Sequence, residues 1–242
     1  MKISLVDVLR CPATGAPLRL IDADPGACLE IISGPLVTDE GRDYTIVDGV
    51  PILLLPETFA EGQAETRESF SEKWRLAPGY REATRPHYVQ WYLERYGFET
   101  LDGLRRFLSP KPRVLDAGTG HGRDVELFVQ NSSAAVFGVD ISNGIYNAYR
   151  DLGHLTALNL IQADLTRLPF PAGFFDFISC DQVIHHTPDT RQSVARLVRH
   201  LAPGGHLGFY VYKKKAPIRE FCDDYIRSFT VGMSVDECMK VS

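Results

Sequence analysis

The sequence predicts an α/β fold with a doubly wound, mostly parallel sheet and a small β-rich module at its N-terminus. The second half of the chain alternates short apolar runs with amphipathic stretches, whereas residues 1–56 carry short β-like runs separated by turn formers. Strands that alternate with helices pair in parallel through right-handed crossovers. Ligands of such sheets bind at the carboxyl ends of the strands, so residues at those ends are the first candidates for functional residues.

The N-terminal module is expected over residues 1–56, where the β-like runs are "APLRLI", "CLEIIS", "DYTIV" and "VPILLL". A helical linker or lid is expected over residues 57–109. It includes a short helix at "ETLDGLRRFL" and a helix that begins near Pro86. The second of these is indicated by apolar residues at i, i+3, i+4 and i+7, namely Val89, Tyr92, Leu93 and Tyr96.

The main domain is expected over residues 110–212. Its strands are "RVLDAG", "AAVFGVD", "NLIQAD", "FFDFIS" and "HLGFYVY", and the stretches between them have helical spacing. Residues 213–242 are mainly helical and contain no convincing pair of final strands. We therefore expect either a C-terminally truncated chain or a last strand left at a sheet edge, where a second copy of the chain can pair.

Composition is typical of a soluble globular protein, with 44% hydrophobic and 24% charged residues among 242. The net charge of −5 argues against bulk nucleic-acid binding. No apolar run is long enough for a signal peptide or a membrane span. Five widely spaced cysteines do not suggest a disulfide framework, so we expect a cytoplasmic protein with reduced thiols.

The stretch "DAGTGHG" joins the first strand of the main domain to its first helix. Gly118, Gly120 and Gly122 allow positive φ and a close approach of a ligand to the main chain, and the following helix N-terminus suits an anionic group. A P-loop would end in Gly-Lys-Ser/Thr, which is absent here. The spacing G-x-G-x-G of these glycines also differs from the G-x-G-x-x-G pattern that is typical of dinucleotide-binding loops.

Two more acidic residues end the next strands of the main domain. Asp140 lies 24 residues after Asp116, where an acid can accept hydrogen bonds from ribose hydroxyls, although an N-cap is the alternative. Asp164 ends the following strand, where the alternative is a turn aspartate. Acids at three successive strand ends are hard to explain by turns alone.

At this point the sequence resembles the class I S-adenosylmethionine-dependent methyltransferases (methyltransferase type 11-like), which have a Rossmann-like fold. The resemblance implies S-adenosyl-L-methionine as cofactor, with Asp116 at its ammonium side, Asp140 at the ribose and Asp164 at the adenine amino group. The implied cofactor-binding residues are Asp116, Gly118, Thr119, Gly120, Gly122, Asp140, Ile141, Asp164, Leu165 and Asp181.

The fourth strand end, "SCDQVIHHTPD", faces the substrate in that family. We expect His186, and next His185, to act as the catalytic base, with Asp181 shaping the site. Packing or capping is the alternative for each histidine. Aromatic residues of the helical section are expected to cover the cofactor, or else to pack as ordinary helix core: Phe70, Trp74, Tyr80, Tyr88 and Trp91.

Residues 1–56 resemble the Trm112-like zinc-ribbon family through "LRCPATGAPLRL" and "YTIVDGVPILLLPE". Zinc-binding members use two Cys-x-x-Cys pairs. Here Cys11 is followed three places on by Thr14, and the second pair is absent, so Cys11 and Cys28 cannot form a four-cysteine site. We expect the fold of the module without its metal.

Together these features predict a methyltransferase for a small-molecule acceptor, with no membrane partner. The alternatives are an RNA or protein methyltransferase, which the Trm112-like module suggests, and a regulatory protein that binds the cofactor without turnover. An NAD-dependent oxidoreductase is disfavoured by the glycine spacing. Lys213 to Lys215 form a basic cluster that is expected to be solvated, with contact to an acidic substrate as the alternative.

Overall fold

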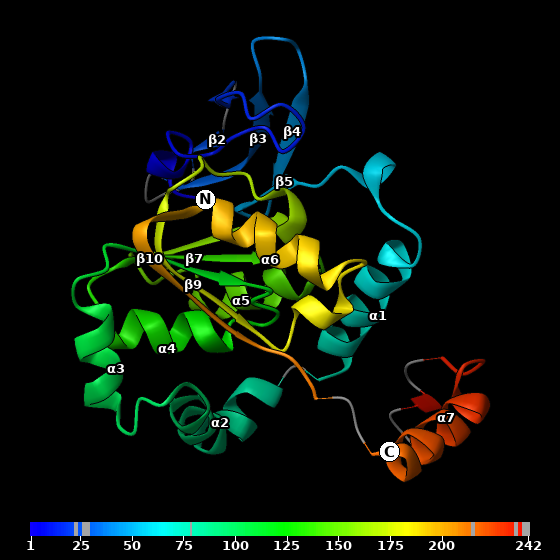
Figure 1. Cartoon of the computed structure of the whole chain (residues 1–242). Helices are drawn as coiled ribbons and strands as arrows, with labels where there is room; N and C mark the ends of the chain where they lie inside the picture. Colours follow the sequence, from blue (N-terminus) through cyan, green and yellow to red (C-terminus); the bar gives the residue numbers. More distant parts are fainter. Residues whose placement is uncertain (22–23, 26–29, 78, 214–215, 235–236, 239–242) are drawn as a thin grey trace.

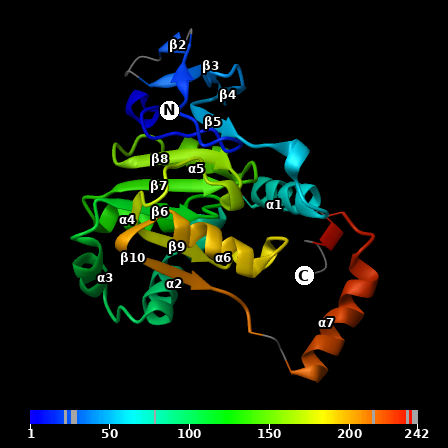
Figure 2. The same ribbon diagram turned by 45° about the horizontal axis from the view of Figure 1, so that its top comes forward.

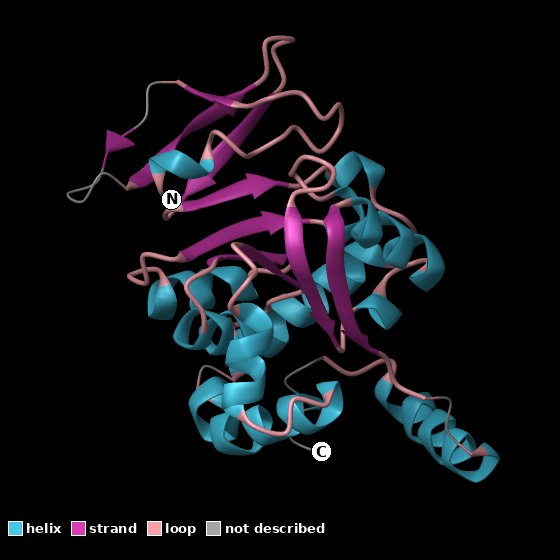
Figure 3. Ribbon diagram, turned by 60° about the vertical axis from the view of Figure 1, so that its left-hand side comes forward, coloured by secondary structure: helices cyan, strands magenta, loops and turns pink. Residues whose placement is uncertain are grey.

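The computed structural model describes residues 1–21, 24–25, 30–77, 79–213, 216–234 and 237–238. These residues form a ten-stranded sheet with helices on both sides of the strands (Figures 1 and 3). The strand order is β1-β3-β4-β5-β8-β7-β6-β9-β10, and β2 pairs with β3. The predicted α/β fold with a doubly wound, mostly parallel sheet is confirmed.

The five strands expected in the main domain are all present and pair in parallel. They are β6 (Arg113–Ala117), β7 (Ala135–Asp140), β8 (Leu158–Ala163), β9 (Phe175–Asp181) and β10 (Leu201–Tyr210). The elements between them are α4 (Arg123–Asn131), α5 (Gly144–Leu152), η3 (Leu165–Arg167), η4 (Ile184–His186) and α6 (Thr190–Arg199). β10 is the outer edge strand, and pairing of two copies along it stays a prediction.

The helical section contains α1 (Gln63–Leu76), α2 (Tyr80–Tyr96) and α3 (Leu101–Leu108). The expectation that a helix begins near Pro86 was wrong, because α2 begins at Tyr80 and contains Pro86. Pro86 removes one backbone hydrogen bond from the helix interior. The buried side chains of Tyr88 and Tyr92 hold the helix against the main domain, so it continues through the proline.

Two hydrophobic cores lie on the two faces of the sheet. One is covered by α2, α3, α4 and α5, where Phe128 packs edge to face on Phe177 at 5.8 Å between ring centroids. The other is covered by α6 and the N-terminal module, where Phe137 packs in the same way on Phe175 at 5.5 Å. Strands buried on both faces explain the nearly continuous apolar runs of the sequence.

The N-terminal module extends the main sheet. Its elements are η1 (Ile3–Leu5), β1 (Arg19–Leu20), β2 (Asp24–Pro25), β3 (Ile31–Val37), β4 (Asp43–Val47), β5 (Val50–Leu53) and η2 (Pro56–Thr58). β5 pairs in parallel with β8, with Ile52 opposite Gln162 and Leu53 opposite Ala163. The likeness of this module to the Trm112-like family stays a prediction.

Cys11 is buried in the module, with its Sγ atom 3.0 Å from the Tyr44 hydroxyl oxygen. Cys28 lies outside the described residues, as do Lys214 and Lys215 of the basic cluster. Within the described parts of the chain, no group of three or more His, Cys, Asp or Glu residues could hold a metal ion. No helix in those same parts is long and apolar enough to span a membrane.

The last described helix, α7 (Pro217–Thr230), stands apart from the sheet and the helices that cover it (Figures 1 and 2). None of its residues is buried. It carries large exposed apolar side chains at Ile218, Phe221, Tyr225, Ile226 and Phe229.

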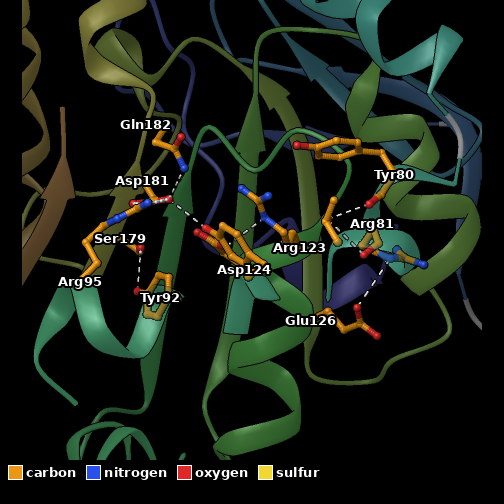
Figure 4. Close-up of polar contacts among 12 residues, drawn as sticks. Tyr80, Arg81, Tyr92, Arg95, Arg123, Asp124, Glu126, Ser179, Asp181 and Gln182 are labelled. Carbon is orange, nitrogen blue, oxygen red and sulfur yellow. Dashed lines mark hydrogen bonds and ion pairs between the residues drawn. The ribbon is translucent and has the colours of Figure 1, made fainter. Parts of the chain in front are cut away.

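One helix face attaches α2 to the end of β9. The Asp181 carboxylate accepts hydrogen bonds from Arg95 Nη1 at 2.5 and 2.6 Å, from the Tyr88 hydroxyl at 2.9 Å and from the Tyr96 hydroxyl at 3.0 Å. The Tyr92 hydroxyl lies 3.1 Å from Ser179 Oγ on the same strand (Figure 4). These four residues of α2 occupy one face because they are spaced by four, seven and eight positions.

We expect Arg95→Met to lower the free energy of unfolding by about 3–5 kcal/mol, because it leaves the buried Asp181 carboxylate without its cation. Denaturant unfolding of the variant measures the loss. In the double variant with Asp181→Asn the loss should be clearly smaller than the sum of the two single effects. Additive losses would show that the Arg95–Asp181 pair does not couple α2 to β9.

Candidate functional site

A cavity of about 650 Å³ opens at the carboxyl ends of β6, β7, β8 and β9. Parallel strands of this kind bind ligands at that edge. Ten of the twelve predicted site residues line it: Asp116, Gly118, Thr119, Gly120, Asp140, Ile141, Asp164, Leu165, Asp181 and His186. Gly122 and His185 are not among its lining residues.

The glycine loop fits closely against its surroundings. Gly118 has φ +96°, and a Cβ atom on it would lie 2.4 Å from Val183 Cγ2. The backbone N–H groups of Gly118 and Thr119 donate to the carbonyl oxygen of Val139 at 2.7 and 3.0 Å, which ties the loop to the end of β7. The loop is thereby held at the base of the cavity with little side-chain bulk.

Gly122 has a packing role instead of a place in the cavity. It is the N-cap of α4 with φ +94°, and a Cβ atom there would lie 2.8 Å from Leu152 Cδ1 and 3.0 Å from Ala148 Cβ. Its missing side chain lets α4 and α5 approach each other. The structure therefore separates this third glycine from the two that line the cavity.

Asp140 connects the glycine loop to the loop before α5. Its carboxylate accepts hydrogen bonds from the Gly120 N–H at 2.7 Å, the Ser142 N–H at 2.7 Å and the Ser142 hydroxyl at 2.5 Å. An ionised carboxylate offers about four acceptor positions. One position therefore remains for a ligand, and burial raises the pKa of this carboxyl.

Asp164 connects the end of β8 to α1. Its Oδ1 atom accepts from the Thr166 N–H at 2.8 Å as the N-cap of η3, which is the turn role that the sequence leaves open. Its Oδ2 atom accepts from Gln63 Nε2 at 2.6 Å. Both Asp164 and Gln63 line the cavity, so the turn role and a ligand contact are compatible.

Two buried carboxylates form the acidic floor of the cavity, Asp116 at the end of β6 and Asp124 in the first turn of α4. They are 2% and 6% exposed, and Asp116 Oδ2 and Asp124 Oδ1 have no hydrogen-bond partner among the described residues. Burial raises the pKa of both, that of Asp124 to about 6. Asp181, the third acid nearby, is already neutralised by Arg95.

Aromatic rings from the helical section cover the other side of the cavity. Trp74 stacks on His121 at 4.3 Å between ring centroids, and Tyr80 lies 5.7 Å from the same imidazole. Phe70 and Trp91 also line the cavity, whereas Tyr88 is directed to Asp181. Burial, followed by the charge of Arg123, lowers the pKa of His121 to about 4, so it is neutral at pH 7.

The two histidines of η4 differ in their position relative to the cavity. The His186 ring contacts Phe70 edge to face at 5.0 Å and lines the cavity. Desolvation and the neighbouring His185 lower the pKa of His186 to about 4. The centroid of the His185 ring lies 4.1 Å from that of His186 and 4.6 Å from that of Tyr212. The two ring nitrogens of His185 have no hydrogen-bond partner within the described chain.

Sequence reasoning did not single out several lining residues. His121, Arg123 and Asp124 stand in the same "GHGRD" stretch as the glycines, and their polarity around the start of a helix was the available signal. Lys73 and Gln63 lie on α1, and nothing in their spacing marks them. They enter the site only because α1 packs over the strand ends.

Comparison with known proteins shows what the part of the chain around this cavity is similar to. Residues 115–209 match the family model described as a methyltransferase domain. An uncharacterised protein of Synechococcus is 36% identical over 46% of this chain and 28% of its own length. The ubiquinone/menaquinone biosynthesis C-methyltransferase of Vibrio vulnificus is 30% identical over 48% of each chain. The structure of a SAM-dependent methyltransferase from Aquifex aeolicus is 18% identical, covers 53% of this chain and 77% of its own, and has a TM-score of 0.41.

The chain spans about half or less of the length of these two curated relatives. Residues 115–209 are similar to a methyltransferase domain, and S-adenosyl-L-methionine is the cofactor that this similarity implies. The cavity fits such a group, because buried polar atoms with no hydrogen-bond partner in the described structure lie around the glycine loop. They are Asp116 Oδ2, Thr119 Oγ1, His121 Nε2, Arg123 Nε and Asp124 Oδ1.

We expect Asp124→Asn to raise the free energy of unfolding at pH 7 by about 1–3 kcal/mol in the absence of ligand. Because the pKa of Asp124 is raised from 3.8 to about 6, the folded protein holds this proton more tightly than the unfolded chain does. Ionisation therefore destabilises the folded state above pH 6. The gain should shrink as pH falls from 6 towards 4 and vanish below that. Denaturant unfolding at pH 7 and pH 4 checks this, and a less stable variant at pH 7 would contradict it.

Proposed function

We propose that the chain is an S-adenosyl-L-methionine-dependent methyltransferase that acts on a small-molecule acceptor. The observation that carries this proposal is a cavity in which the strand ends of a methyltransferase domain meet an aromatic lid. Its volume of about 650 Å³ lies within the range of small-molecule sites. The relative named for C-methylation in quinone biosynthesis supports an acceptor of this class.

In this proposal Asp140 and Asp164 would hold the adenosine part of the cofactor, and Asp116 would hold its amino-acid end. When bound, S-adenosyl-L-methionine supplies a sulfonium methyl group that is already activated for in-line displacement. The chain then has to align the acceptor and exclude water. The rings of Phe70 and Trp74 on α1 are placed to do both, because they close the cavity opposite the strand ends.

His186 is the proposed general base. An acceptor hydroxyl, amine or acidic carbon gives its proton to a ring nitrogen of His186 as the acceptor atom gains the methyl group. The imidazole is available for this at pH 7, since its pKa of about 4 keeps it neutral. His185, 4.1 Å behind it, positions the ring and does not touch the acceptor.

Calorimetry with S-adenosyl-L-methionine, S-adenosylhomocysteine and NAD tests the cofactor. Binding of the first two, and a loss of affinity for both in Asp140→Ala, is the expected result. Preference for NAD would overturn the proposal.

A methyl-transfer screen against a cell extract tests the acceptor. Labelled metabolites would support the proposal, whereas labelled RNA or protein would support the macromolecular alternative. Cofactor binding without turnover would support a regulatory protein.

We expect His186→Gln to reduce kcat by about 10²–10⁴-fold while S-adenosylhomocysteine affinity stays the same, because it removes the base without touching the cofactor. His154→Gln is the matched control, since His154 is exposed and does not line the cavity. Steady-state kinetics on an acceptor from the extract screen measures both variants. Equal rates in the two variants would remove His186 from the mechanism.

A further inference from the structure

The first turn of α4 presents two neighbouring side chains of opposite charge to the cavity. Arg123 and Asp124 both line it, and Arg123 Nε lies 4.0 Å from Asp124 Oδ1. Neither of these two buried atoms has a hydrogen-bond partner in the described part of the chain. Buried polar atoms nearly always have a hydrogen-bond partner in folded proteins. Two such atoms of opposite charge, joined only by a long ion-pair contact, indicate a ligand that carries both charges.

The surroundings hold the pair in place without neutralising it. The Arg123 guanidinium carbon lies 3.1 Å from the centre of the Tyr88 ring, and the Tyr88 hydroxyl donates to Asp181. Arg95 binds Asp181, so that carboxylate does not compete for Arg123. Figure 4 shows Arg123 and Asp124 between the Asp181–Arg95 pair and Tyr80 with Arg81.

We propose that Arg123 and Asp124 together bind the zwitterionic amino-acid end of the cofactor. Arg123 contacts the α-carboxylate and Asp124 contacts the α-ammonium group. This inference rests on the proposed function, which supplies the ligand. The N-terminus of α4 adds partial positive charge beside Arg123, which favours a carboxylate at this place.

The arrangement also explains why a second buried acid lies next to Asp116. One ammonium group can donate three hydrogen bonds, so it can satisfy Asp116 Oδ2 and Asp124 Oδ1 together. The other charged and titratable groups around Asp124 are Arg123 on α4, Asp181 on β9, and Tyr88 and Arg95 on α2. Arg95 is bound to Asp181, and Arg123 stacks on a tyrosine ring and approaches Asp124 only to 4.0 Å. The ligand's ammonium group therefore supplies the hydrogen-bonded counter-charge that Asp124 lacks.

Calorimetry with three ligands separates this role from a general effect on the pocket. S-adenosylhomocysteine carries the whole amino-acid end, decarboxylated S-adenosylmethionine keeps only the amine, and 5′-methylthioadenosine has neither group. Asp124→Asn should weaken binding of the first two by about 10- to 100-fold, the range for a hydrogen bond to a charged group. Arg123→Gln should weaken S-adenosylhomocysteine alone to a similar degree. Neither variant should change the affinity for 5′-methylthioadenosine.

Glu126→Gln is the matched control. It removes a carboxylate from the same turn of α4, but Glu126 pairs with Arg81 and Arg85 and does not line the cavity. Its ligand affinities should equal those of the unmodified chain. Unchanged S-adenosylhomocysteine affinity in Asp124→Asn, or equal losses for all three ligands, would overturn the inference. Failure of the unmodified chain to bind S-adenosylhomocysteine would instead overturn the proposed function.

Discussion

The Asp181–Arg95 ion pair is the interaction on which the arrangement of the site depends. Asp181 ends the strand next to the glycine loop, and one face of α2 reaches it through Arg95, Tyr88 and Tyr96. Because the pair is buried, with side chains 1% and 7% exposed, loss of either partner leaves an uncompensated charge. The pair therefore fixes α2 against β9, and α2 in turn brings Tyr80 and Trp91 to the cavity.

The same ion pair determines the charge of the cavity floor. Burial and the neighbouring acids raise the pKa of Asp116 and of Asp124. Arg95 binds Asp181 closely, whereas Arg123 approaches Asp124 only to 4.0 Å. Asp116 and Asp124 are left as buried acids that destabilise the folded chain without a ligand. Local features that oppose stability are typical of functional sites, where a ligand supplies the missing partner.

The N-terminal module affects the site through the sheet and through α1. β5 joins the free side of β8, so the small module and the main domain share one sheet. The chain then passes from β5 through η2 to α1, whose Gln63 binds Asp164 at the end of β8. The start of α1 is thus tied to β8 through β5 and through Gln63, which restricts where Phe70, Lys73 and Trp74 lie over the cavity.

The sequence alone predicted the fold class, the five strands of the main domain and ten site residues that line the cavity. Strand period, helix period and glycine position are local properties, so "DAGTGHG" and the acids at 140 and 164 could be located without coordinates. It could not decide that Gly122 packs between α4 and α5, that α2 continues through Pro86, or that Asp181 is bound by α2. Those outcomes depend on contacts between residues as many as 93 positions apart, such as Tyr88 and Asp181, which no local pattern encodes. Only tertiary packing places Arg123 and Asp124, two polar residues at a helix start, in a cavity with buried atoms that have no hydrogen-bond partner among the described residues.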